Sequence, residues 1–342
     1  MLRYIVRRIM MLPLLLFGVS ILIFMMLQLL TPYERASLYV RDIPKQPGSL
    51  DALVVKYGLD RPIHEQYLSW AGQVLRGNLG FSKVGKAPVM EVILRHLPAT
   101  LELTLWTAIP LVWVGIQLGV LSAVRRGTIV DHFSRVFAIV GWSFPLFIFG
   151  LLVLMIFYAR LGWFPAGRLS DWANRIVLSS SFHRYTSMNT LDAFLNGRID
   201  IFIDALRHLV LPVITLSYLS WALILRVTRS SMLEALRQDF VTTARAKGLE
   251  ERVVINRHVK PNAMIPVATI GGLTLVGLMN GVVITETVFN YRGMGWFFAN
   301  SALTLDVISV LGVVIFNAAI LVLGNLIVDV LYVYLDPRIR LT

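Results

Sequence analysis

The segment IMMLPLLLFGVSILIFMMLQLL, residues Ile9–Leu30, runs for 22 positions without a charged side chain. A helix needs about 20 apolar residues to cross the hydrocarbon core of a bilayer, so this segment is long enough to span one. Five further windows have the same character, with Glu102 as the one charge among them: Pro98–Val124, Val136–Ala159, Leu209–Leu225, Ala263–Thr285 and Val307–Val328. The six windows predict an all-α integral membrane protein with six transmembrane helices.

The overall composition excludes several other classes of protein. The chain has 342 residues, of which 56% are hydrophobic and 15% are charged, whereas about a quarter of the residues in a soluble domain are charged. It contains no cysteine, so disulfides and thiolate metal sites are excluded. The net charge of +12 would suggest a nucleic-acid-binding protein if the chain were soluble. In a membrane protein, basic residues set the orientation and attract anionic membrane lipid, so we expect no nucleic-acid partner.

The positions of the basic residues predict the orientation of the chain. If the N-terminus is cytoplasmic, the inner segments contain 16 Lys and Arg in 70 residues, and the outer segments contain 16 in 137. Cytoplasmic loops carry an excess of these residues, and the rule is strongest for short loops. The short outer segment 286–306 contains only Arg292. We therefore expect both termini to be cytoplasmic.

The six windows also divide the chain into three parts. Residues 1–30 form the cytoplasmic N-terminus and the first transmembrane helix, 31–97 form a small extracytoplasmic subdomain, and 98–342 form a five-helix core. We expect this core to contain an extracytoplasmic loop, 160–208, and a cytoplasmic loop, 226–262.

The extracytoplasmic subdomain contains a clear helical pattern. Apolar residues recur at helical spacing from Ile63 to Leu75, Pro62 precedes them and Gly77 follows them. These signals predict a helix that begins near Pro62 and ends before Gly77. Two roles are open for the subdomain, namely scaffolding of the outer helix ends and docking of an extracytoplasmic partner.

The cytoplasmic loop 226–262 contains the signals of a short, capped helix. Asp239 belongs to a residue type that caps helix N-termini, and Gly248 suits the left-handed conformation that ends a helix. Small residues lie between them: Thr242, Thr243, Ala244 and Ala246. Two interpretations are open, a helix that is gripped by another protein and an ordinary interfacial linker.

Sequence motifs for catalysis are missing. The chain contains no GxxxxGK[ST] phosphate-binding loop, no GxSxG nucleophile elbow and no HExxH zinc motif. Its six histidines are scattered along the sequence. We therefore expect no catalytic residue, no metal site and no cofactor in this chain.

A few polar residues lie within or beside the predicted spans. Such groups are costly to place in a membrane, which makes them candidates for function. We consider five of them as candidates for a substrate path: Glu102, Gln117, Asn280, Glu286 and Asn317. We expect Glu102 to be a satisfied interfacial carboxylate near Arg95 and His96, and Glu286 to pair with Arg292.

Two pairs of glycines have the spacing that lets helices approach closely. They are Gly115-x-x-x-Gly119 and Gly277-x-x-x-Gly281. Because small residues bring helix backbones together in membranes, these pairs predict tight helix contacts within or between subunits.

Several stretches, in order along the chain, closely resemble the dipeptide/oligopeptide class of bacterial ABC importer permeases. They are GLDRP at 58–62, GNLGFS at 77–82, LPATLEL at 97–103, TRSSMLE at 228–234, DFV at 239–241, TARAKGL at 243–249, ETVF at 286–289, GMG at 293–295 and LDPRIR at 335–340. Together they cover nearly the whole chain and are very specific. The resemblance implies the type I ABC importer permease fold and a B-type subunit.

Permeases of this class carry a cytoplasmic coupling motif, Glu-Ala-Ala, three residues, Gly, nine residues, then Ile-x-Leu-Pro. Ala244, Gly248 and Pro261 match this motif. Departures of the kind that are usual in the peptide-importer branch occur at Thr242, Thr243, His258 and Lys260. The resemblance implies that the following residues couple the chain to an ATPase: Asp239, Thr242, Thr243, Ala244, Arg245, Gly248 and Pro261.

The resemblance also implies a set of partners. These are a homologous second permease subunit, one or two ABC ATPase subunits that hold ATP and Mg, and an extracytoplasmic substrate-binding protein. The complex would lie in the plasma (inner) membrane of a prokaryote, with this chain forming half of the translocation pathway.

The cargo is left open, because members of the class import peptides, oligosaccharides or nickel. After the first span the class often has Pro-Gly-Asp-Pro, whereas this chain has Thr31-Pro32-Tyr33-Glu34. We expect an importer of peptides or similarly sized solutes, with an oligosaccharide importer as the alternative. From other classes, an ion-coupled secondary transporter, a membrane-embedded enzyme and a membrane scaffold are the rivals.

Overall fold

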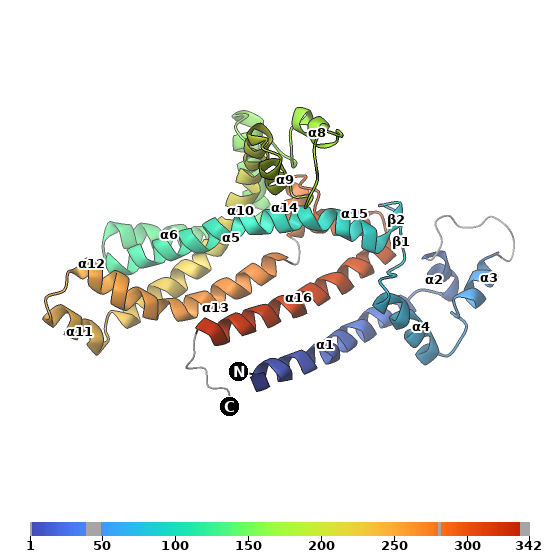
Figure 1. The fold of residues 1–342 in the computed structure, drawn as a ribbon, viewed down its shortest axis with the longest axis horizontal. Coiled ribbons are helices and arrows are strands. Elements are labelled where there is room, and N and C mark those ends of the chain that lie inside the picture. The colour runs from blue at the N-terminus through green and yellow to red at the C-terminus, as the bar shows by residue number, and fades with distance from the viewer. Residues whose placement is uncertain (1, 39–48, 280–281, 336–342) are drawn as a thin grey trace.

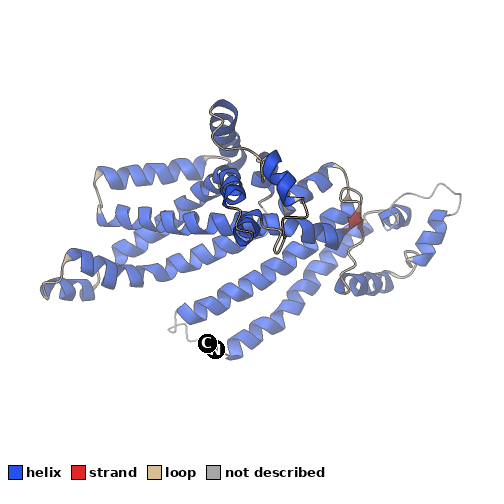
Figure 2. Cartoon of the chain, turned by 45° about the horizontal axis from the view of Figure 1, so that its top comes forward, coloured by secondary structure: helices blue, strands red, loops and turns tan. Residues whose placement is uncertain are grey.

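A computed structural model describes residues 2–38, 49–279 and 282–335 of the chain. These residues are almost entirely helical, with one two-stranded ladder (Figure 2). The segments predicted to be extracytoplasmic contain α2 (Pro32–Leu38), α3 (Ser49–Lys56), α4 (Ile63–Leu75), β1 (Phe81–Ser82), β2 (Ala87–Pro88), α8 (Asp171–Val177), α9 (Asn189–Leu195), α14 (Val283–Val288) and α15 (Met294–Leu303). The remaining elements are α1 (Leu2–Gln28), α5 (Val89–Val124), α6 (Ile129–Ser143), α7 (Leu146–Val153), η1 (Leu154–Arg160), α10 (Ile199–Ala235), α11 (Asp239–Ala246), α12 (Glu251–Val253), η2 (Val254–Val259), α13 (Lys260–Met279) and α16 (Val307–Leu335).

The long apolar helices confirm the all-α membrane fold. Within the described residues, four helical stretches are long and apolar enough to cross a membrane: Met10–Gln28, Val89–Val124, Glu251–Leu278 and Val307–Ile327. Two further pairs of helical segments meet the same test together but are bent, and counting each pair as one span gives six.

One predicted span differs from the prediction. The window Val136–Ala159 is not one straight helix, because the segments Ile129–Ser143 and Leu146–Arg160 meet at an angle of 105°. The bend lies at Pro145, which has no backbone donor, and Phe144 before it has the extended backbone that a following proline favours (φ −81°, ψ 127°). The apolar composition of the window carried no information about this break.

The membrane helices form two groups that lie along each other (Figure 1). In the first group, α5 and α10 pack together over much of their length, and α6 and α13 both contact them. In the second group, α1 lies along α16, which in turn contacts α13. Leucines from α5 and α10 and Val267 from α13 share the buried core between the helices of the first group.

The close approach of α5 to α10 occurs at the first of the predicted glycine pairs. A Cβ atom at Gly115 would lie 2.8 Å from a methyl group of Ile224, and one at Gly119 would lie 2.9 Å from the backbone oxygen of Leu225. The second pair differs: Gly277 has no atom within 4 Å of a built Cβ, and Gly281 lies outside the described residues.

The predicted helix of the outer subdomain is α4, which spans Ile63–Leu75 and is followed by Gly77 in the left-handed conformation. The α4 helix packs on the C-terminal half of α1, where the Tyr67 hydroxyl lies 2.7 Å from the Ser20 hydroxyl. Trp70 extends this contact into the core that joins α1, α5 and α16. The subdomain is therefore held by the ends of the membrane helices.

Candidate coupling site

The short helix α11 lies at one end of the bundle, beyond the ends of α10 and α13 (Figure 1). Its inner face is anchored, because Val241 and Ala244 are buried against Met232 of α10 and against Val254 and Val259 of η2. Tight apolar packing resists deformation, so this contact joins α11 rigidly to the two helices that flank it.

The end of α11 is closed as the sequence predicts. Gly248 has φ +78°, and its N–H donates to the Arg245 carbonyl at 2.9 Å. The N–H of Leu249 donates to the Ala244 carbonyl at 3.4 Å, which completes the pair of bonds of a Schellman motif. Because a residue with a Cβ is strained at positive φ, a glycine is the residue best suited to this position.

The start of α11 differs from the prediction. Gln238 holds the N-cap position with an extended backbone, and Asp239 is the first residue within the helix. No side-chain oxygen caps this end. The carboxylate of Asp239 instead lies in the first turn, where a negative charge is favoured by the helix dipole.

The connection from α11 to the next membrane helix is tied by an exposed ion pair. The Arg245 guanidinium donates two hydrogen bonds to the Glu251 carboxylate, at 2.6 and 3.0 Å. The chain then continues into η2, which is a π-helix and has wider turns than an α-helix. At its end the Lys260 N–H donates to the Ile255 carbonyl, five residues back. Wide turns of this kind recur at functional sites, and this one ends next to Pro261.

The outer face of α11 is open to solvent in this chain. Exposed residues on and beyond the helix are Asp239, Phe240, Thr242, Thr243, Arg245, Ala246, Lys247, Gly248 and Leu249. Two of them are large and apolar, Phe240 and Leu249, each 39% exposed. Of the seven coupling residues named from the sequence, all except the buried Ala244 are exposed, and Pro261 lies in the first turn of α13. A rigidly anchored helix with an exposed face of mixed apolar and polar side chains is suited to contact with another protein.

At the other end of the bundle, Glu102 is a buried carboxylate with a full set of donors. Arg168 donates to it at 2.8 Å and the Tyr291 hydroxyl at 2.8 Å. The backbone N–H and the hydroxyl of Thr190 also donate, at 2.6 and 2.9 Å. Glu102 is thus satisfied, as predicted, but its cationic partner is Arg168 and not Arg95. No sequence signal singled out Arg168, because its partner lies 66 positions away.

Glu286 has different partners from those predicted. Its carboxylate accepts hydrogen bonds from the Thr100 hydroxyl at 2.7 Å and from the Trp296 backbone at 2.9 Å. Arg292 instead lies over the ring of Trp296, 5.5 Å from its centroid. Glu286 is fully buried on α14 beside the start of α15, where its carboxyl oxygen accepts from a backbone N–H in the first turn of that helix. The physical reason is that burial requires donors on both oxygens, which an exposed arginine does not supply.

The other candidates for a substrate path lie apart from these two carboxylates. Gln117 lines a cavity of about 450 Å³ between α5 and α13, whose walls include Trp113 and Lys260. Asn317 is half-buried on α16, and Asn280 lies outside the described residues. Within the described part of the chain, no cluster of three His, Asp or Glu side chains has the arrangement of a metal site.

Membrane-spanning helices with a short, exposed helix at the end of the bundle have the arrangement expected of a transport permease subunit. Comparison with known families agrees with this class. A family model described as "Binding-protein-dependent transport system inner membrane component" matches residues 115–341, and one described as "Binding-prot-dependent transport system membrane comp, N-term" matches residues 1–104. The chain belongs to this family, and it is an integral inner-membrane permease subunit of the dipeptide/oligopeptide ABC class.

Three curated relatives are similar to the chain over nearly its full length. The di/tripeptide transport system permease protein DppB of Pseudomonas aeruginosa is 36% identical, over 99% of both chains. The dipeptide transport system permease protein DppB of Escherichia coli K12 is also 36% identical, over 99% of both chains. The oligopeptide transport system permease protein AppB of Bacillus subtilis is 36% identical, over 98% of this chain and 99% of the relative.

Proposed function

We propose that this chain forms half of the translocation pathway of an ATP-driven importer of peptides. The cargo class is supported by the relatives, which are named as dipeptide, di/tripeptide and oligopeptide permeases. The partners are a homologous second permease, one or two ATPase subunits that hold ATP and Mg, and a substrate-binding protein outside the membrane. The chain supplies the path and the coupling surface.

The observation that carries the proposal is that the outer face of α11 is exposed while its inner face is packed firmly against α10 and η2. A groove on an ATPase subunit grips this face through Phe240, Thr243 and Lys247, which lie on adjacent turns and are exposed. Since Val241 and Ala244 pack against α10 and η2, a displacement of α11 moves both flanking helices as one body. Rigid-body movement between two packed arrangements is a standard route of switching in proteins.

The cavity between α5 and α13 is the part of the path that this movement opens and closes. It has largely apolar walls, with Gln117 as a hydrogen-bonding group and Lys260 as a positive charge at the end of α13 next to η2. A path of this composition accommodates side chains of varied character and binds none of them tightly. Such weak contact suits a pathway that releases its cargo.

The proposal places both chain ends in the cytoplasm. The N-terminal part of α1 and the C-terminal part of α16 are directed toward the end of the bundle at which α11 lies (Figure 1). The basic residues of the inner segments favour the same orientation. In this orientation α11 faces the cytoplasm, where ATP is available, and α8 and α9 face the binding protein.

Cross-linking tests the contact directly. The chain contains no cysteine, so Thr243→Cys introduces its single thiol on the exposed face of α11. A benzophenone maleimide attached there should form an adduct with an ATPase subunit in the assembled complex. The matched control is Asn174→Cys on α8, which is exposed at the opposite end and should give no such adduct. An intact complex without an adduct from position 243 would contradict the proposal.

A glycine substitution tests the coupling. Gly248→Val strains the left-handed turn at φ +78° and should reduce peptide uptake at a given rate of ATP hydrolysis in proteoliposomes. Gly77→Val is the control, since Gly77 has φ +79° and equally open surroundings but lies in the outer subdomain. Coupling that is unchanged in Gly248→Val would count against a mechanical role for α11.

A further inference from the structure

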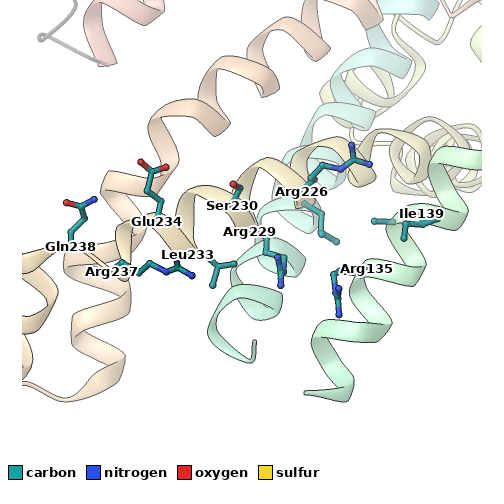
Figure 3. Close-up of a pocket in the computed structure, with 11 residues that line it drawn as sticks. Arg135, Ile139, Arg226, Arg229, Ser230, Leu233, Glu234, Arg237 and Gln238 are labelled. Carbon is teal, nitrogen blue, oxygen red and sulfur yellow. The ribbon is translucent and has the colours of Figure 1, made fainter. Parts of the chain in front are cut away.

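A cavity of about 700 Å³ lies between α6 and the C-terminal half of α10, close to the start of α11 (Figure 3). Four arginines line it: Arg135 from α6, Arg226 and Arg229 from α10, and Arg237 from the turn between α10 and α11. None of these residues belongs to the coupling motif or to the candidate substrate path. The cavity is therefore a separate feature of the chain.

The arginines of the cavity leave an excess of positive charge. Arg229 is bound by Asp131 through two hydrogen bonds of 2.9 and 3.0 Å, and Arg135 lies 3.6 Å from the same carboxylate. Among the described residues, no carboxylate lies within ion-pair distance of Arg226 or Arg237. Glu234 is the one carboxylate on the lining, and Asp131 lies behind it, so four positive charges are set against two negative charges, which leaves an excess of two.

The wall beside the cavity is apolar and exposed. Ile139 lines the cavity, and Val136 and Trp142 continue from it along α6, with exposed fractions of 60%, 58% and 62% respectively. The Arg226 guanidinium lies over the ring of Trp142, 5.9 Å from its centroid. A cationic hollow that borders an apolar helix face is the arrangement found where lipid headgroups meet their acyl chains.

We propose that this cavity binds the phosphate of an anionic phospholipid from the membrane leaflet on the α11 side. Guanidinium groups bind phosphate oxygens through paired hydrogen bonds, so Arg226 at the Trp142 end of the lining and Arg237 at the α11 end are the two positions at which the headgroup is held. The acyl chains then lie against Ile139 and Val136. A soluble protein partner would leave this apolar face uncovered, which is why the arrangement favours a lipid over an acidic protein surface.

The bound lipid connects the membrane to the coupling site. Arg237 is followed directly by Gln238, the N-cap residue of α11, while Arg135 lies on α6. A lipid with its headgroup at Arg237 and its acyl chains against Ile139 therefore bridges α6 to the turn that precedes α11. This inference stands independently of the cargo, because its test measures lipid binding alone.

Native mass spectrometry of the purified complex tests the site. In a titration with phosphatidylglycerol, the double variant Arg226→Gln/Arg237→Gln should bind the lipid about 25-fold more weakly than wild type, since each arginine near a headgroup contributes roughly a fivefold factor. Phosphatidylcholine, with no net charge, should bind weakly to both proteins. The Arg229–Asp131 pair remains in the variant, so its unfolding temperature in lipid-free detergent should equal that of wild type.

The control is Arg125→Gln/Arg126→Gln, which removes two exposed charges from the turn between α5 and α6 without touching the cavity. This variant should bind phosphatidylglycerol as wild type does, and equal weakening in both variants would overturn the proposal. Competition by millimolar inorganic phosphate would show a site for the free anion and would also overturn it. Unchanged lipid binding together with loss of the ATPase from the Arg226→Gln/Arg237→Gln complex would mean a protein-binding surface, again against the proposal.

Discussion

Glu102 on α5 and Arg168 in the loop between η1 and α8 form a salt bridge of 2.8 Å, with the carboxylate side chain only 2% exposed. The bridge joins a membrane helix to the long loop that carries α8 and α9. The same carboxylate also holds Thr190, at the start of α9, and the Tyr291 hydroxyl. One buried group thus fixes three segments that are distant in sequence.

Removal of this carboxylate should destabilise the protein strongly. Glu102→Ala removes the carboxylate from the half-buried Arg168 and from the buried donors of Thr190 and Tyr291, and breaking a buried network of this kind costs about 3–5 kcal/mol. We expect a clearly lower unfolding temperature in detergent. Glu65→Ala is the control, because Glu65 forms an exposed pair with Arg61 at 3.7 Å and its loss should change little. Equal unfolding temperatures for Glu102→Ala and wild type would show that the network carries no stability.

Glu286 should make stability depend on pH. It lies outside the candidate spans, and burial raises its pKa from 4.5 to about 7. Between these values the folded protein holds a proton that the unfolded chain releases, so stability from this group is full below about pH 4.5 and is lost as the pH rises through 7. The difference amounts to about 3 kcal/mol at most.

The measurement is the unfolding temperature in detergent between pH 5 and pH 8, in wild type and in Glu286→Gln. The glutamine variant keeps a side-chain acceptor for Trp296 but does not titrate. It should therefore show a smaller fall in unfolding temperature with rising pH than wild type. Identical slopes would rule out Glu286 as the titrating group.

Gly119 should tolerate no side chain. A Cβ atom there would lie 2.9 Å from the Leu225 backbone oxygen and closer still to Thr228, so Gly119→Ala forces α5 away from α10. Overpacking of this kind costs about 1–3 kcal/mol. The matched control is Gly277→Ala. Gly277 also lies within a helix, but a Cβ atom built on it would have no neighbouring atom within 4 Å, so this substitution should be neutral or slightly stabilising. Thermal unfolding of both variants checks the difference, and equal effects would argue against the close contact.

The ion pair between Arg245 and Glu251 should contribute little to stability despite its short distances. Both side chains are about half exposed, at 48% and 54%, and exposed pairs contribute about 0–1 kcal/mol. We expect Arg245→Gln to unfold within a degree or two of wild type. A large loss would mean that the pair is shielded in the assembled complex, which comparison of the free chain with the complex would reveal.

Local signals in the sequence predicted several elements correctly. The helix Ile63–Leu75 follows from its apolar stripe and from Pro62 and Gly77, because these residues act on their immediate neighbours. The left-handed turn at Gly248 follows for the same reason. The coupling motif was recognisable because its residues lie close together along the chain.

Predictions that depended on distant partners fared less well. Glu286 was expected to pair with Arg292, which is near in sequence, but its donors are Thr100 and the backbone of Trp296. The bend at Pro145 was missed because charge-free composition reports polarity and not direction. The roles of the coupling residues and of the path residues stay predictions.

The sequence by itself determined the class of the protein. Both of its signals, the apolar runs long enough to span a bilayer and the capped short helix, depend on residues that are adjacent in the chain. Only the tertiary structure decided which groups neutralise the buried charges. Arg168 meets Glu102, and Arg229 meets Asp131 across 98 positions. The physical reason is that a buried carboxylate binds whichever donors the packing of whole helices brings within about 3 Å, and that selection is not encoded in any single segment.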